Sequence, residues 1–236
     1  MLGWTTRHLL VAAVMTVVLG ALPSTAFVPA DCGVKPATKM TCDRVAFLPG
    51  EYGTFFSGAL VRGERAVYLL DAKAGQSLVL DITSLEDNAV YDVFGPSGTM
   101  LAVEATGGAI LLPESGDYSI IVGGTRGNAS YDLEVYVYRA EVLRFGAGAT
   151  GTSVSDAVVR GERAAYVLGA AGGQTMFVSI TSFEDNAVFA VYPPSGPPIV
   201  REVTDANFSL PDTGDYSIIV GGIRGNASYD LRVEIP

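Results

Sequence analysis

The chain has 236 residues, with 15 Lys or Arg, 25 Asp or Glu, a formal net charge of −10 and a pI near 4.5. Its one tryptophan, Trp4, and its one histidine, His8, fall in a segment expected to be removed, which would leave 14 basic and 25 acidic residues, a net charge of −11 and no imidazole. This composition excludes Ser-His-Asp and Cys-His catalysis and histidine metal sites, and it disfavours nucleic acid as a partner.

Residues 1–30 have the three parts of a secretory signal peptide: a short basic start, an apolar run and small residues at a cleavage site. The apolar run, Leu9 to Leu22, has about 14 residues, which is short of the roughly 20 that a membrane-spanning helix needs. Cleavage is expected after Ala26 or Ala30. The alternative is an uncleaved membrane anchor. No later segment is apolar for long enough to span a membrane, so the protein is predicted to be secreted, periplasmic or extracellular.

The only two cysteines, Cys32 and Cys42, lie in an N-terminal segment, residues 31–44. An exported chain enters an oxidising compartment, so a disulfide that closes this short loop is the expectation. A redox or metal role is the weaker alternative, because the spacing is not CxxC and no third ligand lies nearby.

The rest of the chain is an internal duplication with an offset of 98 residues. Residues 112–135 and 210–233 are identical at 20 of 24 positions by direct count. The repeats are predicted to cover residues 45–138 and 143–236, and each has the size of one small domain. The joint between them is short and rich in Gly and Ala.

Within each repeat the apolar residues recur with a period of two, which is typical of strands. Leu78, Leu80 and Ile82 alternate with more polar positions, and runs around Tyr118 and Tyr131 behave in the same way. Gly-, Pro- and Ser-rich turns separate these runs. The predicted fold is all-β, with two tandem antiparallel, jelly-roll-like β-sandwiches of about eight strands each. A closed barrel is the alternative architecture.

Several short motifs occur in the same order in both repeats. They are Tyr68, the turn 74–76, FGPSG at 94–98, LPESGDYSIIV at 112–122 and Tyr131-Asp132-Leu133, with counterparts in the second repeat. Through these motifs each repeat resembles the bacterial pre-peptidase C-terminal (PPC) domain, a β-sandwich appended to secreted enzymes. That resemblance implies a glycan- or surface-binding role. This chain departs from the family pattern, because the two repeats leave no room for a catalytic domain.

A narrower resemblance is carried by the order A-x-x-G-Q (72–76), FGP (94–96), LPxSGxY (112–118) and a Thr-Arg-Asn-rich loop (125–128). This order is similar to that of the periplasmic inhibitors of goose-type lysozyme. The resemblance implies that the Ser-Gly-x-Tyr loop enters the lysozyme cleft. The implied binding residues are Ser115, Gly116 and Tyr118, with Thr213, Gly214 and Tyr216 in the second repeat, where Thr213 departs from the motif.

The tyrosines of this loop have a second interpretation. Period two places Tyr118 and Tyr216 on the inward face of a strand, where each hydroxyl would fix a nearby backbone group. A buried tyrosine could also brace an exposed loop, so the two interpretations are compatible.

A second set of predicted binding residues lies in the polar loop after this strand: Arg126 and Asn128, and Arg224 and Asn226. A guanidinium there could pair with a carboxylate of a partner, and lysozymes use catalytic carboxylates. The alternative is a hairpin turn with a solvated arginine.

The acidic loops Glu86-Asp87-Asn88 and Glu184-Asp185-Asn186 carry oxygen atoms that calcium accepts. Their spacing does not match an EF-hand, and calcium takes 6–8 oxygen ligands. A polar turn is therefore the expectation, and no metal, cofactor or catalytic residue is predicted.

Two hypotheses about function remain. The first is a secreted, non-enzymatic binding protein that inhibits a cationic lysozyme or another cell-wall hydrolase, since an acidic chain is attracted to such a partner. The alternative is a glycan- or cell-surface-binding adhesion module of the PPC type, for which stabilisation by calcium is an open question. A hydrolytic enzyme is the third and least favoured class, because the expected mature chain has no histidine.

Overall fold

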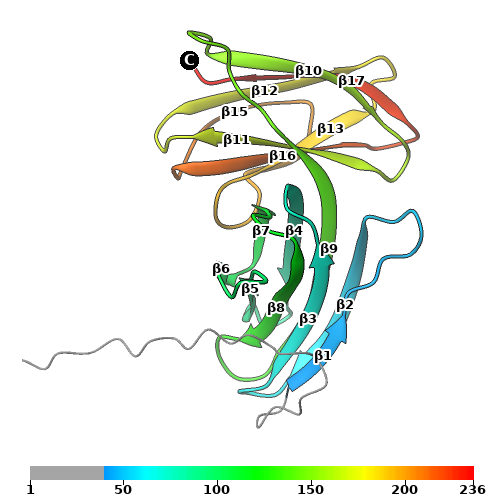
Figure 1. Cartoon of the computed structure of the whole chain (residues 1–236), viewed down its shortest axis with the longest axis vertical. Helices are drawn as coiled ribbons and strands as arrows, with labels where there is room; N and C mark the ends of the chain where they lie inside the picture. Colours follow the sequence, from blue (N-terminus) through cyan, green and yellow to red (C-terminus); the bar gives the residue numbers. More distant parts are fainter. Residues whose placement is uncertain (1–39) are drawn as a thin grey trace, which may run out of the picture.

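A computed structural model of the chain describes residues 40–236, which form 17 strands and no helix (Figure 1). The first repeat contains β1 (Met40–Arg44), β2 (Gly53–Leu60), β3 (Arg65–Ala72), β4 (Gln76–Thr83), β5 (Ala89–Phe94), β6 (Met100–Ala105), β7 (Gly107–Leu111), β8 (Gly116–Gly124) and β9 (Ala129–Val142). The second contains β10 (Gly151–Val158), β11 (Arg163–Ala170), β12 (Thr175–Ser182), β13 (Ala187–Tyr192), β14 (Val200–Val203), β15 (Asp205–Ser209), β16 (Gly214–Gly222) and β17 (Ala227–Glu234). The all-β prediction is confirmed.

Each repeat packs two sheets face to face. In the first repeat, the sheet β1-β3-β8-β5-β6 faces β2, β9, β4 and β7. In the second, β14-β13-β16-β11 faces β10-β17-β12-β15. The two repeats also share a sheet, because β9 pairs with β4 at its start and with β11 at its end. Figure 1 shows β9 rising out of the first sandwich into the second.

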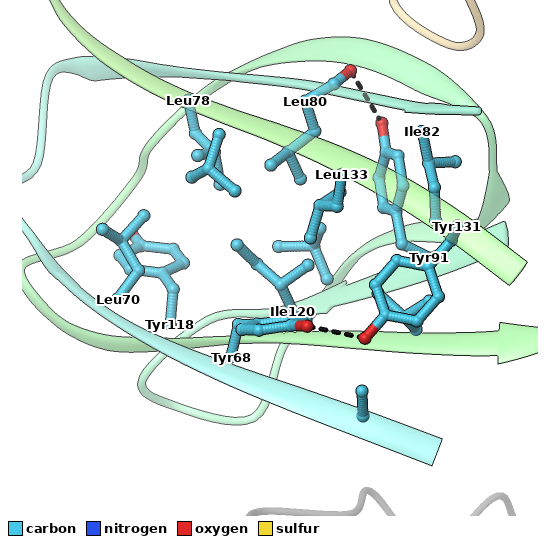
Figure 2. Close-up of a cluster of buried hydrophobic side chains, with 14 of the residues drawn as sticks. Tyr68, Leu70, Leu78, Leu80, Ile82, Tyr91, Tyr118, Ile120, Tyr131 and Leu133 are labelled. Atoms are coloured by element: carbon cyan, nitrogen blue, oxygen red, sulfur yellow. Dashed lines mark hydrogen bonds between the residues drawn. The ribbon is translucent and has the colours of Figure 1, made fainter. Parts of the chain in front are cut away.

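The period-two pattern places the expected side chains in two separate cores. Leu78, Leu80 and Ile82 of β4 point into the first core (Figure 2) and face Ile120 of β8. The second core repeats this arrangement with Met176, Val178, Ile180 and Ile218. Such burial of aliphatic side chains stabilises each sandwich by roughly 1.5–3 kcal/mol per large side chain relative to exposure.

Two strand pairs differ from the antiparallel prediction. β1 runs parallel to β3, and the end of β9 runs parallel to β11. In the second pair Ala140, Glu141 and Val142 lie opposite 165–167. Residues 129–142 contain no glycine or proline, so nothing in this stretch stops the strand before it reaches β11. Residues 139–142, part of the expected joint between the repeats, are therefore strand, and loop structure follows only after them.

The repeats also contact each other through apolar side chains on the outer faces of their sheets. Val79, Ala109 and Tyr138 of the first repeat cluster with Ala165, Ala190, Tyr192 and Ile219 of the second. Beside this cluster Arg201 Nη2 donates to Asp81 Oδ1 at 2.7 Å, and the Tyr192 hydroxyl donates to Asp81 Oδ2 at 3.1 Å. The Arg201 guanidinium also lies 5.8 Å from the centre of the Tyr192 ring.

Two of the N-terminal predictions fall outside the described residues. The predicted signal peptide, residues 1–30, and Cys32 are not described, while Cys42 lies in β1. The Cys32–Cys42 disulfide therefore stays a prediction. Within residues 40–236 no helix has the length and apolar character needed to cross a membrane.

Candidate functional site

The Ser-Gly-Asp-Tyr loop joins β7 to β8 and is closed by a tyrosine hydroxyl. Tyr118 is fully buried in the first core. Its hydroxyl donates to the Glu114 carbonyl at 2.6 Å and accepts from the Glu114 amide at 3.2 Å. Burial raises the pKa of this phenol, so it stays a neutral donor at physiological pH. Full burial of Tyr118 favours the interpretation that this tyrosine braces the loop from within the core, and its direct contact with a partner stays a prediction.

The apex of the loop is formed by the exposed Ser115 and by the half-buried Gly116, the first residue of β8. The Ser115 hydroxyl accepts a hydrogen bond from the Ala74 amide at 3.0 Å, which ties the loop to the turn between β3 and β4. Gly116 has a φ of 142°, and a Cβ added there would lie 3.0 Å from the Pro96 ring. Glycine is thus required at this position by both backbone conformation and space.

The second repeat builds the same loop. The Tyr216 hydroxyl, fully buried, donates to the Asp212 carbonyl at 2.7 Å and accepts from the Asp212 amide at 3.1 Å. Thr213 Oγ1 accepts from the Gly172 amide at 2.9 Å, and Gly214 has a φ of 152°. Threonine can replace serine here because the hydroxyl is the group that the loop uses. Tyr216, like Tyr118, braces its loop from within the core, and its direct contact with a partner stays a prediction.

The Thr-Arg-Gly-Asn loop joins β8 to β9, with the exposed Arg126 near its tip. Arg126 Nη2 donates to the Glu86 carbonyl at 3.3 Å, and Asn128 Oδ1 accepts from the Arg62 amide at 3.0 Å. Beneath the loop the buried Asn88 donates from Nδ2 to the Arg126 and Asn128 carbonyls at 2.6 and 2.8 Å. Arg126 and Asn128 thus hold three neighbouring loops together.

Arg224 and Asn226 occupy the same places in the second repeat. Arg224 Nη2 donates to the Glu184 carbonyl at 3.0 Å, and Asn226 Oδ1 accepts from the Arg160 amide at 2.9 Å. The duplication has therefore kept the loop's internal bonds along with its residues.

These two loops lie at opposite ends of one strand. β8 begins directly after Ser115 and ends at Gly124, before the Arg126 loop. A nine-residue strand at about 3.3 Å per residue separates its two ends by roughly 26 Å. Ser115 and Arg126 therefore do not converge on one surface, and the same holds for Thr213 and Arg224 at the two ends of β16.

The charged groups next to the loops are largely engaged. A hydrogen bond from Arg44 lowers the pKa of Asp117, whose carboxylate receives both Arg44 nitrogens at 2.9 and 2.7 Å. At the other end, a hydrogen bond from the Ser130 hydroxyl lowers the pKa of Glu86. Glu86 and Asn88, considered above as oxygen ligands, thus serve loop bonds. Within the described part of the chain no group of three His, Cys, Asp or Glu is placed to hold a metal ion.

The fold and loops define a class: a tandem β-sandwich protein that presents rigid, duplicated loops at the ends of its sandwiches.

No protein-family model and no curated protein matches the chain. Solved structures similar to it include PliG of Aeromonas hydrophila, a periplasmic inhibitor of g-type lysozyme, which is 26% identical over 42% of this chain and 97% of that one, with a TM-score of 0.38. PliG of Salmonella Typhimurium is 24% identical (41% and 97% covered, TM-score 0.36), and a PliG mutant of Escherichia coli is 20% identical (42% and 99% covered, TM-score 0.35).

A cavity of about 230 Å³ between the repeats was not foreseen from the sequence. It is lined by residues of both repeats, among them Asp81, Tyr136, Tyr192 and Arg201. The signal for it was present, because apolar and aromatic residues such as Val79 and Tyr136 occupy outward positions of strands that already have an apolar inward face. A second apolar face indicates a second packing partner.

Proposed function

We propose that the protein is a secreted, non-catalytic binding protein that inhibits a lysozyme-type cell-wall hydrolase. In this proposal Ser115 and Gly116, with Thr213 and Gly214, form the contact surface. The observation that carries it is the construction of the loop: an exposed apex on a backbone that a fully buried tyrosine hydroxyl fixes from beneath. The construction occurs twice in the chain.

A rigid loop suits the blocking of an enzyme cleft. Ordering a flexible loop on binding costs roughly 0.5–1.5 kcal/mol for each side chain immobilised, and a loop held in place beforehand avoids much of that cost. Here Tyr118 fixes the Glu114 backbone and Ser115 is tied to Ala74, so the loop is ordered before any partner arrives. The small apex residues also allow close approach of another backbone.

The charge of the chain favours the same class of partner. The net charge of −11 expected for the mature chain attracts a cationic hydrolase and speeds encounter at low salt. Close to the first apex stands Glu114, and Asp212 and Asp215 place negative charge near the second. Predicted export would bring the protein to the compartment where cell-wall hydrolases act.

The test is a turbidity assay of bacterial cell lysis by goose-type lysozyme, with the mature chain added at micromolar excess. The wild type is expected to slow lysis. Arginine at both apices (S115R with T213R) places bulk and positive charge against a cationic enzyme, and should weaken inhibition at least about tenfold, or 1.4 kcal/mol.

The matched control changes the opposite ends of the same strands. Alanine at Arg126 and Arg224 (R126A with R224A) should leave inhibition within about twofold of wild type, given the roughly 26 Å separation along β8. No slowing of lysis by the wild type would refute the function. If R126A/R224A lost inhibition while S115R/T213R kept it, the contact with the hydrolase would instead lie at the Arg126 end of the sandwich.

A further inference from the structure

Each repeat has a groove along one side of its sandwich. Residues of β1, β2 and β3 line the groove of the first repeat, and Figure 1 shows these three strands at one edge of the sandwich. The groove of the first repeat has a volume of about 360 Å³ and that of the second about 740 Å³. The two are built from equivalent positions 98 residues apart, because Asp43, Glu64, Arg65 and Tyr68 line the first and Glu141, Glu162, Arg163 and Tyr166 line the second. Both volumes fall in the range of small-molecule sites.

The first groove has a pair of buried tyrosine hydroxyls in its wall. The hydroxyl oxygens of Tyr68 and Tyr131 lie 2.6 Å apart, and Figure 2 shows the two groups pointing at each other. Both side chains are more than nine-tenths buried, and both line the groove. Two hydroxyls carry two protons, and the bond between them uses one. Neither hydroxyl has another hydrogen bond within residues 40–236, so one donor remains unused.

The second repeat shows what satisfies this donor. The hydroxyls of Tyr166 and Tyr229 also lie 2.6 Å apart, and the Tyr166 hydroxyl donates its proton to Asp156 Oδ2 at 3.1 Å. The position equivalent to Asp156 in the first repeat is Gly58, which has no side chain. The chain therefore supplies the acceptor in one repeat and lacks it in the other. A buried donor without an acceptor costs about 1–3 kcal/mol, which a ligand oxygen would recover.

The charges around the grooves indicate a neutral ligand. In the second groove the Asp156 carboxylate is accompanied by Arg139, whose equivalent in the first groove is Thr41. The first repeat thus lacks the equivalents of Asp156 and Arg139, while Asp43 and Arg65 remain in its groove. Because Asp43 raises the pKa of Tyr131 through its charge, after the larger effect of burial, the site disfavours a second anion.

The remaining groups suit a ligand rich in hydroxyls. A sugar hydroxyl both donates and accepts hydrogen bonds. The tyrosine pair and Arg65 provide donors, while Asp43 provides a carboxylate acceptor along the same groove. Apolar side chains of Met40 and Leu60 complete the lining, as expected for the apolar face of a sugar ring.

We propose that the groove of the first repeat is a binding site for a neutral saccharide, which accepts the free proton of the Tyr68–Tyr131 pair. In the second groove Asp156 already accepts the proton of the equivalent tyrosine pair, so that groove does not bind the saccharide in this way. This site is separate from the apex loops assigned to the hydrolase, and neither proposal depends on the other.

The test is calorimetry on the full mature chain with three neutral probes: the N-acetylglucosamine trimer, maltotriose and lactose. At least one should bind with a Kd below about 5 mM, which is measurable at probe concentrations of about 20 mM. Phenylalanine at both hydroxyl positions (Y68F with Y131F) keeps the rings and removes the donor, and should weaken that probe at least about tenfold. The matched control, Y166F with Y229F, should stay within about twofold.

A surface variant guards against a folding defect in the double mutant. Thr41→Arg adds to the lining of the smaller first groove the side chain that Arg139 has at the equivalent position, keeps both tyrosine hydroxyls, and should also weaken binding of the probe at least about threefold. The proposal would be overturned if none of the three probes bound. It would also be overturned if Y166F/Y229F lost as much affinity for the probe as Y68F/Y131F, or if acetate and glucuronate bound and the neutral probes did not. Lysozyme inhibition by Y68F/Y131F should equal that of wild type, so the two proposals fail separately.

Discussion

Replacing Asp81 by serine should loosen the contact between the two repeats. Serine is the residue that the second repeat has at the equivalent position, Ser179, so the change is one that the strand accepts. Asp81 lies on the outer face of β4 and accepts from two groups of the other repeat, Arg201 and Tyr192. The substitution removes both bonds and leaves the two cores unchanged.

The cost follows from the burial of the two donors. The Arg201 side chain is 53% exposed, so water replaces the carboxylate and the loss is at most about 1 kcal/mol. The Tyr192 residue is only 4% exposed, and its hydroxyl would lose its acceptor, at about 1–2 kcal/mol. Together these give a loss of roughly 1–3 kcal/mol in the free energy of unfolding.

A second Asp–Arg pair in the same chain provides the control. Asp117 and Arg44 are joined at 2.7 Å, as Asp81 and Arg201 are, but their side chains are 47% and 54% exposed. Asp117→Ser should therefore cost below about 1 kcal/mol. Both variants would be compared by urea denaturation, followed by circular dichroism. If Asp81→Ser costs no more than Asp117→Ser, burial of the Tyr192 hydroxyl is not what gives this contact its strength.

Three further predictions concern the loop and the tyrosines. Tyr118→Phe should cost about 1–2 kcal/mol in urea denaturation, because the Glu114 backbone loses its partner. Gly116→Ala should cost more than Gly75→Ala: both have positive φ (142° and 80°), but only Gly116 has atoms within 4 Å of an added Cβ. Burial raises the pKa of Tyr229 to about 12, which favours the neutral phenol in the folded state. Its contribution, on the order of 3 kcal/mol, should be complete below pH 10 and be lost as pH rises from 10 to about 12, which unfolding measured at several alkaline pH values would check.

The inward face of each sheet could be predicted from the sequence, because period two is a local property of a strand. Leu78 and Leu80 are fully buried as the alternation requires. The burial of the outward face could not be predicted in this way, because Val79 is covered by the other repeat and not by its own sandwich. Local pattern shows that a second apolar face exists, and only the tertiary arrangement shows what covers it.

The exposure of the predicted loop residues could be read from the sequence, but their arrangement in space could not. The motif identified Ser115 and Arg126 correctly as exposed loop residues, and the duplication drew attention to both. The order of motifs along a chain does not show whether two loops lie at the same end of a sandwich. Here the loops lie at opposite ends of β8, and the length of that strand separates them. The Tyr68–Tyr131 pair was beyond reach, because the two residues are 63 positions apart and only sheet packing brings their hydroxyls together.

The path of β9 bears on how the protein can be divided. Its last residues form the edge strand of a sheet in the second sandwich, as β1 does in the first. Residues 140–142 run parallel to β11, and the equivalent residues 42–44 run parallel to β3. A fragment that starts at residue 143 would lose this edge strand and expose the side of β11. A fragment meant to contain the second sandwich alone should therefore begin near residue 138, inside β9. The boundary of the repeated sequence and the boundary of the complete sheet thus differ by about five residues.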